Sequence, residues 1–193
     1  MQAKTKGKRK AILEAASLVF RRDGFNLAKV EDIAITAGIG KGTVYEYFSS
    51  KAQLFLEIYK ESLMSLLHSI EAIKQENSSP PNKLETLARL LLEHIVKSKD
   101  LSRTATDISS QLDEEFMVWM RDIHVRKISL IQDVFDEGIR SGEFRKVNSY
   151  TAALMFTGTV SALFAPITFA DVEFNYDEYI RESMDLVLRG IAQ

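Results

Sequence analysis

The sequence of 193 residues contains no cysteine, only three prolines and a single tryptophan. The absence of cysteine excludes disulfides and thiolate metal sites, and no pair among the three histidines has metal-ligand spacing. We therefore expect no metal and no other cofactor. The polar and basic start, Met1 to Lys6, lacks the apolar core of a signal peptide, which predicts a cytoplasmic protein. With 46% hydrophobic residues, the chain can form one large domain or two small ones.

The formal net charge is only −2, but the charge is unevenly distributed. Residues 1–51 contain ten Lys and Arg against five acidic residues, whereas residues 52–193 contain 15 against 22. A basic head on an acidic body is typical of a nucleic-acid-binding domain joined to a domain that does not bind nucleic acid.

Helical periodicity extends over nearly the whole chain, and no segment has a convincing strand pattern. We therefore expect an all-α fold with about nine helices. Capping residues predict four helix starts, at Ser50, Asn82, Asn148 and Asn175. A long helix is expected from about Glu114 to Arg140, ending before Gly142.

Residues 30–48 predict two short helices joined by a tight turn. Ala34 marks a close crossing of the two helices, and Gly38 can adopt the positive φ that such a turn requires. The apolar positions beneath them are Val30, Ile33, Ile39, Val44 and Phe48. This helix-turn-helix pattern places a recognition helix in the DNA major groove, although similar hairpins also occur as packing in ordinary helical bundles.

The N-terminal segment resembles the DNA-binding domain of the tetracycline-repressor (TetR) family of transcription regulators over residues 9–55. The resemblance is carried by Ala11 to Ala16, Phe20, Gly24-Phe25, Val30, Asp32 to Ala34, Ala37-Gly38, Lys41 to Tyr45, Tyr47-Phe48 and Lys51. It implies a helix-turn-helix domain over residues 1–50 and a helical effector-binding and dimerisation domain over residues 51–193. It also implies a homodimeric repressor that binds double-stranded DNA at an inverted-repeat operator and is released by a small, apolar effector.

Two positions depart from the pattern of this family. Ala28 and Lys29 stand where a Thr or Ser usually caps the first helix of the motif, and the missing cap costs that helix about 1 kcal/mol. Gly40 replaces a Ser that often caps the recognition helix, so one hydroxyl contact with DNA is absent. Neither change removes the motif.

The expected DNA-binding residues are Lys29, Lys41, Gly42, Thr43, Tyr45, Tyr47 and Lys51. We expect Lys41 and Thr43 to face base edges, while Gly42 allows close backbone approach. The two tyrosines, Lys29 and Lys51 are expected to contact phosphates, Lys51 at a helix N-terminus. The basic residues from Lys4 to Lys10 could form a flexible arm that adds nonspecific attraction, or a solvated tail.

Residues 147–170 contain no charged side chain and are long enough to span a bilayer. Their Ser, Thr, Asn and Pro residues, and the soluble helices on both sides, favour a buried interface over a membrane span. We expect this helix and the last helix to pair with their copies in a two-fold symmetric four-helix bundle. The expected interface residues are Gly158, Ala162, Tyr179, Ile180, Met184 and Val187.

Aromatic and methionine residues concentrate in the C-terminal half. Most of them are explained by core packing, but the resemblance implies an effector pocket among them. The expected pocket residues are His94, Phe116, Trp119, Met120, His124, Met155 and Phe156. His94, His124 and Arg103 could orient a polar end of the effector.

Three other functions have to be compared with this one. A phosphate-binding loop at Gly38 to Thr43 fails because Gly42 separates Lys41 from Thr43 and Ile35 occupies the position of the first glycine. An enzyme would need a nucleophile with its base, a carboxylate pair or a metal cluster, and none is convincing. A helical dimer that binds proteins without ligand control stays open as the alternative function.

Overall fold

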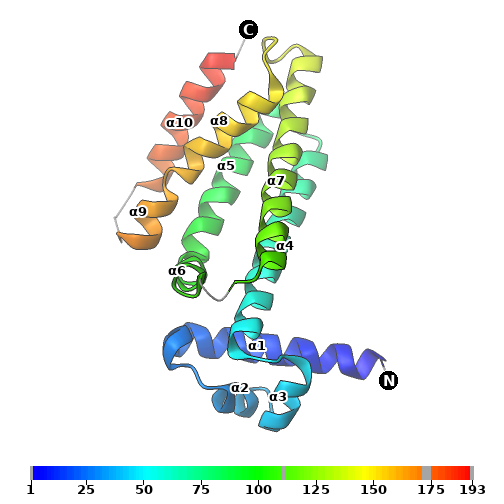
Figure 1. Cartoon of the computed structure of the whole chain (residues 1–193). Helices are drawn as coiled ribbons and strands as arrows, with labels where there is room; N and C mark the ends of the chain where they lie inside the picture. Colours follow the sequence, from blue (N-terminus) through cyan, green and yellow to red (C-terminus); the bar gives the residue numbers. More distant parts are fainter. Residues whose placement is uncertain (1, 110–111, 171–174, 192–193) are drawn as a thin grey trace. The chain divides into compact units, whose positions relative to one another are not determined.

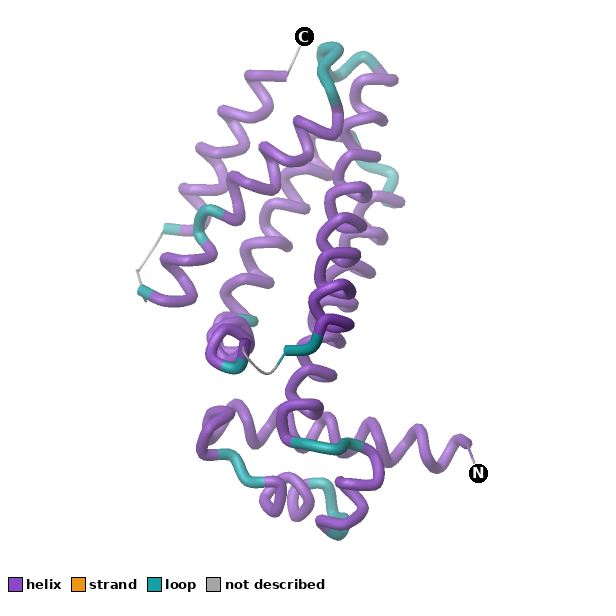
Figure 2. The backbone as a smooth tube through the Cα atoms, in the orientation of Figure 1, coloured by secondary structure: helices purple, strands orange, loops and turns teal. Residues whose placement is uncertain are grey.

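The computed structural model describes residues 2–109, 112–170 and 175–191, which form helices with no β-strand among them (Figures 1 and 2). The helices are α1 (Gln2–Leu27), α2 (Val30–Thr36), α3 (Lys41–Tyr47), α4 (Lys51–Gln75), α5 (Pro80–Lys97), α6 (Lys99–Asp107), α7 (Glu114–Ser141), α8 (Ser149–Ser161), α9 (Phe164–Phe169) and α10 (Tyr176–Ile191). The all-α fold is confirmed, and the expected number of about nine helices is close to the number found.

The helices group into two compact units. The first contains the chain up to Ser62 and a short segment that begins at Thr104, and the second contains Leu63–Arg103 and the chain from Leu112 onward. Helices α4 and α6 therefore contribute residues to both units.

In the first unit, α1 packs on α2 and α2 packs on α3. Helix α1 changes direction at Gly24, whose φ of 74° and ψ of 160° are non-helical, and this brings Phe25 back against Phe20 and Phe55. The three ring centroids lie 5.4 to 6.1 Å apart. The expectation that the basic N-terminal segment is flexible is wrong, because the residues from Gln2 onward are helical and Arg9 forms an ion pair with Glu57 of α4. The nonspecific attraction of this segment to DNA stays a prediction.

In the second unit, α7 packs against α5 and α8, and α10 packs against α5 and α8. The core between these helices contains Phe135, whose ring contacts those of Phe144 and Phe156 at centroid distances of 5.9 and 6.1 Å. Leucines of α5, isoleucines of α7 and Ile180 of α10 complete the core.

Local capping explains several helix starts. Asn148 accepts a hydrogen bond from the Thr151 amide at 2.8 Å, and Asn175 accepts one from the Glu178 amide at 3.2 Å, as the sequence predicts. The start expected at Asn82 is wrong, because α5 begins at Pro80, with Ser79 as its N-cap. Proline is favoured in the first turn since its missing N–H has no intrahelical acceptor there, so the prolines extend the helix backwards.

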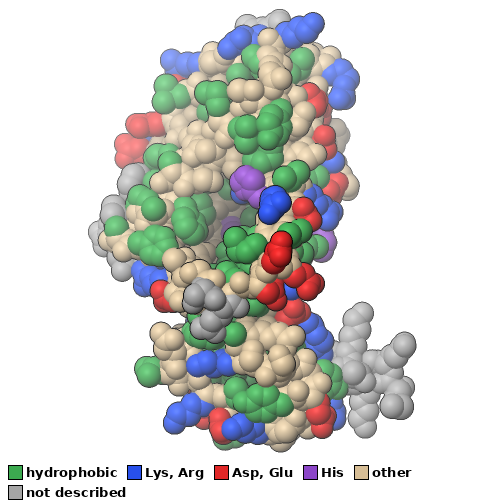
Figure 3. Space-filling model, in the orientation of Figure 1, with side chains coloured by type: hydrophobic (Ala, Val, Ile, Leu, Met, Phe, Trp, Pro, Cys, Tyr) green, Lys and Arg blue, Asp and Glu red, His purple; other side chains and the backbone are tan. Residues whose placement is uncertain are grey.

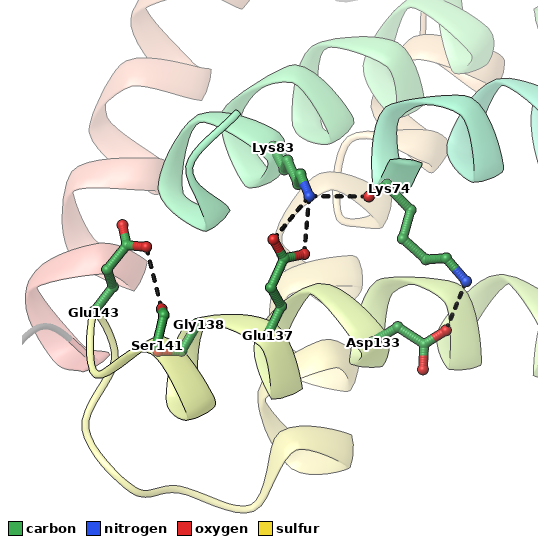
Figure 4. Close-up of polar contacts among 7 residues, drawn as sticks. All are labelled: Lys74, Lys83, Asp133, Glu137, Gly138, Ser141 and Glu143. Atoms are coloured by element: carbon green, nitrogen blue, oxygen red, sulfur yellow. Dashed lines mark hydrogen bonds and ion pairs between the residues drawn. The ribbon is translucent and has the colours of Figure 1, made fainter. Parts of the chain in front are cut away.

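A buried lysine joins three helices of the second unit (Figure 4). Lys83 of α5 is 4% exposed, and its ammonium donates to both carboxylate oxygens of Glu137 at 2.9 Å and to the carbonyl of Lys74 at 2.9 Å. Lys74 pairs with Asp133 at 3.0 Å on the surface beside it. Because α5 and α7 run antiparallel, the Lys83–Glu137 pair also sets their register.

The uncharged segment is interrupted. Helix α8 ends at Ser161 and α9 starts at Phe164, because Pro166 lacks the N–H that would bond to the carbonyl of Ala162. Residues Ser149–Phe169 are apolar and long enough to cross a membrane, with a mean hydropathy of 1.6 over 18 residues, of which 39% are buried inside the structure. Its buried side packs on α5 and α7, while its other side is an exposed surface without charge.

Candidate DNA-binding and effector-binding sites

The turn between α2 and α3 has the geometry of a Schellman motif. Gly38 has a φ of 67°, its amide donates to the carbonyl of Ile35 at 3.1 Å, and the amide of Ile39 donates to that of Ala34 at 3.0 Å. Ala34 is buried beneath this turn. The two bonds satisfy the last carbonyls of α2 and fix the direction in which α3 leaves the turn.

Helix α3 presents most of the expected recognition residues on one side. Lys41, Gly42 and Tyr45 are exposed, whereas Val44 is 1% exposed and anchors the helix. Thr43 and Tyr47, four residues apart, are half-buried on the flank of the same helix. The structure thus brings a cation, a bare backbone and two hydroxyl-bearing rings together on one helix, a set of groups that can bind phosphates and base edges.

Both helices of the motif lack a side-chain cap, as the sequence predicts. Lys29 is the N-cap of α2 and Gly40 is the N-cap of α3, and neither supplies a capping hydrogen bond. Lys29 is exposed at the N-terminus of α2, where its charge is available to an anion.

Lys41 already has partners within the motif. Its ammonium bonds to the carboxylate of Glu31 in α2 and lies 5.9 Å from the centre of the Tyr45 ring. The hydrogen bond between them lowers the pKa of Glu31 and raises the pKa of Lys41, so both groups are charged at neutral pH. A phosphate or base that binds Lys41 therefore competes with Glu31 for the ammonium.

Lys51 has a different environment from the one expected. Its ammonium donates to the carbonyls of Phe25 at 2.7 Å, Ala28 at 3.0 Å and Asn26 at 3.3 Å, and lies 4.6 Å from the centre of the Phe25 ring. Burial lowers the pKa of Lys51. Because three backbone carbonyls engage its donors, the side chain holds the end of α1 against the start of α4.

The expected effector residues do not form one group. Phe116 and Trp119 stack with ring centroids 5.8 Å apart, and Trp119 and Met120 are half-buried on α7. Phe156 is fully buried against Phe135. Phe156 belongs to the core of the second unit, whereas Phe116 and Trp119 lie near the start of α7 and outside that core.

Met155 does not belong with them. It is 70% exposed, one residue from Phe156 and therefore on the outer side of α8. Arg103 is also occupied, because its guanidinium donates to the carbonyl of Thr168 at 2.6 and 3.0 Å.

Lys127 was not among the residues expected at the effector site. This residue of α7 is half-buried, and burial lowers its pKa. Burial also lowers the pKa of His94 and that of His124, and the charge of Lys127 adds to both effects. A four-residue spacing could have indicated that this lysine lies on the inward side of α7, because Lys127 stands four positions after Ile123 and four before Ile131.

The expected interface residues fall into two groups. Gly158 and Ala162 are exposed on α8 and at its C-terminus. On α10, Ile180 and Met184 are 1% and 3% exposed and lie in the core of their own chain, and Val187 is partly buried against it. Tyr179 links the two helices, since its hydroxyl donates to the carbonyl of Thr159 at 2.6 Å.

No group of three or more possible metal ligands lies together in the described parts of the chain. The candidate sites are therefore a basic, polar helix surface in the first unit and an apolar interior with basic groups in the second.

Comparisons with known proteins agree with this division. Residues 12–58 match the family described as bacterial regulatory proteins, tetR family, and residues 67–193 match the C-terminal region of QacR-like proteins. The transcriptional repressor KstR2 of Mycolicibacterium smegmatis is 30% identical over 145 residues, which cover 72% of this chain and 68% of that protein.

Solved structures share the fold at lower identity. A regulator of the TetR/AcrR family from Thermobifida fusca is 22% identical, with a TM-score of 0.80 over 95% of this chain and 98% of that one. The regulator FadR from Bacillus subtilis in complex with stearoyl-CoA is 22% identical, with a TM-score of 0.71 over 94% and 98%. On the two family matches, which together span most of its length, the chain belongs to the TetR family of bacterial transcriptional regulators and is not an enzyme.

Proposed function

We propose that this regulator is a cytoplasmic homodimeric repressor that binds an inverted-repeat operator and is released by a small molecule. The observation that carries the DNA-binding part is the exposed side of α3, where Lys41, Gly42 and Tyr45 lie together above a Gly38 turn that fixes the helix direction. The related KstR2 is named a transcriptional repressor, which supports repression rather than activation.

Lys41 and Thr43 contact base edges, with Gly42 allowing the helix backbone close to the groove. Tyr45 and Tyr47 bond phosphates, and Lys29 adds a charge at the N-terminus of α2. Lys51 acts indirectly: its bonds to the carbonyls of Phe25 and Ala28 hold the motif in place, which revises its expected contact with a phosphate.

The dimer forms through the outer side of α8. Gly158 and Ala162 share this side with Leu154 and Met155, which are 41% and 70% exposed, and no charged residue interrupts it. An exposed apolar stripe of this kind is suited to a partner subunit. Helix α10 adds Leu186, which is 75% exposed, while Ile180 and Met184 support the interface from within.

The effector binds along α7 of the second unit, between Phe116, Trp119 and Met120 near the start of this helix and the buried Phe156 of α8. Aromatic and methionine side chains suit an apolar ligand, and the complex of the related FadR with stearoyl-CoA supports a ligand with a long apolar part. The bound form favours a conformation in which α4, shared by both units, holds the two recognition helices at the wrong separation.

Selection of bound sequences from random double-stranded DNA tests this function. We expect an inverted repeat whose half-sites lie about one helical turn, 34–36 Å, apart or somewhat more, and a symmetric footprint. The variants Thr43→Val and Tyr47→Phe form a matched pair, since loss of the first hydroxyl should change sequence preference and loss of the second should weaken all sequences alike. Absence of any sequence-selective binding at low salt would contradict the proposal and favour a protein-binding helical dimer.

A further inference from the structure

Helices α5 and α7 bring two basic side chains to the same level of the second unit. On α5, His94 follows Lys83 by eleven residues, which is about 16 Å along the helix. On α7, Lys127 precedes Glu137, the partner of Lys83, by ten residues, which is about 15 Å. Because the two helices are antiparallel and packed together, His94 and Lys127 lie at the same level, and the charge of Lys127 contributes to the lowered pKa of His94. His124 precedes Lys127 by three residues on α7 and is exposed at the edge of this side of the helix.

Both side chains continue an inward-facing stripe. His94 follows Leu84, Leu87 and Leu91, which are all buried on α5. Lys127 comes directly before the buried Ile128 and four residues before the buried Ile131. An ammonium placed on such a stripe is partly removed from water, and this disfavours its charged form.

No protein anion compensates this charge in the described parts of the chain. Lys83 of the same unit is more deeply buried, but Glu137 neutralises it at 2.9 Å, whereas no described carboxylate forms an ion pair with Lys127. A half-buried cation without a partner is an unfavourable arrangement unless an anion binds to it.

Two further polar groups lie inside the same unit without a partner. The hydroxyls of Thr157 in α8 and Thr168 in α9 are buried and make no hydrogen bond among the described residues. Both helices pack on α5, which carries His94. Figure 3 shows a hollow over α5, between α7 and the α8–α9 segment, with histidine and a basic side chain at its edge.

We propose that Lys127, supported by His94 and His124, binds the anionic group of the effector, which is therefore an amphiphile with an apolar body and a carboxylate or phosphate end. This inference rests on the proposed function and specifies the polar end of the expected apolar effector as an anion. The apolar body packs against the aromatic residues of α7 and α8, and the anion supplies the charge that the protein does not.

The first test concerns the protein without ligand. We expect Lys127→Met to raise the midpoint of thermal unfolding, because it removes an uncompensated half-buried charge and keeps the apolar stem. A lysine with a purely structural role would give the opposite shift. Lys97→Met is the matched control, since Lys97 is exposed on α5 and paired with Glu93, and this variant should not raise the midpoint.

The second test compares straight-chain carboxylates of eight to eighteen carbons with the alcohols of the same length. At least one carboxylate should stabilise the wild-type protein and release operator DNA at about tenfold lower concentration than its alcohol. Lys127→Met should remove this difference, Lys127→Arg should keep part of it, and Lys97→Met should leave it intact. The coenzyme A thioester of the best carboxylate tells whether Lys127 binds a carboxylate or a phosphate. If the thioester is more potent than the free acid, the bound anion is a phosphate of coenzyme A. If the free acid is more potent, the bound anion is its carboxylate.

Equal action of carboxylates and alcohols, or the same carboxylate preference in Lys127→Met, would overturn the inference. So would the failure of every carboxylate and of its thioester to act on a protein that still binds its operator. In each case sequence-selective operator binding would leave the DNA-binding function standing.

Discussion

At the scale of single residues, Gly138 is required by the ring of Phe144. A Cβ atom at this position would lie 2.2 and 2.3 Å from two ring carbons, and the amide of Phe144 donates to the Gly138 carbonyl at 3.0 Å, so the ring has little freedom to withdraw. We expect Gly138→Ala to lower the free energy of unfolding by about 1–3 kcal/mol, measured by chemical denaturation.

Gly190→Ala is the control for this prediction. Gly190 also lies in a helix, but nothing comes within 4 Å of the position that a Cβ atom would occupy, so the substitution should be neutral or stabilise by about 0.5–1 kcal/mol through helix propensity. Equal effects of the two substitutions would show that the Phe144 ring adapts.

The Lys83–Glu137 pair predicts an asymmetry between its two partners. Glu137→Gln leaves the buried ammonium of Lys83 with the Lys74 carbonyl and a neutral amide, and should destabilise the protein by about 2 kcal/mol. Lys83→Met removes the buried charge, so its cost should be smaller. Denaturant midpoints of the two variants measure the difference.

Asp133→Asn provides the surface comparison. Its partner Lys74 is 26% exposed and Asp133 is 49% exposed, so loss of this pair should cost less than about 1 kcal/mol.

If Lys83→Met proved as costly as Glu137→Gln, the Lys83–Glu137 pair would contribute net stability rather than only avoiding an unpaired charge.

At the scale of elements, we expect the ion pair between α2 and α3 to limit the affinity of α3 for DNA. Glu31→Gln releases Lys41 and removes a negative charge near the DNA, so we expect tighter binding to random DNA. Lys41→Gln should weaken binding and lower the slope of log affinity against log salt by about 1. Fluorescence anisotropy over a series of salt concentrations measures both.

Glu14→Gln is a suitable control for the removed charge, because Glu14 pairs with Lys10 within α1 rather than with the recognition helix. Tighter binding to random DNA in both variants would mean that overall charge, and not the release of Lys41, is responsible.

The elements also show which features the sequence could predict. The turn at Gly38 and the caps at Asn148 and Asn175 were predictable because each depends on residues within five positions of one another. The start of α5 was not, because Pro80 and Pro81, which the sequence suggests as a break between helices, form the first turn of α5.

The two sides of α8 could not be distinguished from the sequence. Both are apolar, so periodicity does not tell that Phe156 faces the core and Met155 faces outward. The role of Lys51 was equally hidden, since its acceptors lie 23 to 26 residues earlier and depend on the bend at Gly24. The proposed DNA-contacting side of α3 follows a local pattern, whereas the proposed effector site depends on how distant helices pack.

At the scale of the whole molecule, the dimer proposal makes DNA binding depend on the outer side of α8. Met155→Asp places a charge in the centre of this side and should weaken the dimer by about 2 kcal/mol, or about 30-fold. Sedimentation velocity should show monomers at micromolar concentration, and operator affinity should fall because two half-sites are no longer bound together.

Val125→Asp is the matched control. Val125 is 61% exposed on α7, so it tests an added charge on an exposed apolar residue outside the proposed interface. A dimer that tolerates Met155→Asp but is broken by Val125→Asp would move the interface to α7.

The ion pair between Lys41 and Glu31 has a consequence for the search of the regulator for its operator in a cell. A chromosome offers about 10⁶–10⁹ competing nonspecific sites. Each unpaired lysine on the recognition helix α3 lengthens the residence time of the protein at such sites. A lysine that must first leave Glu31 gains less from phosphates that any sequence supplies. Fewer copies of the protein would then be held on irrelevant DNA, and a small number of dimers could keep a single operator occupied.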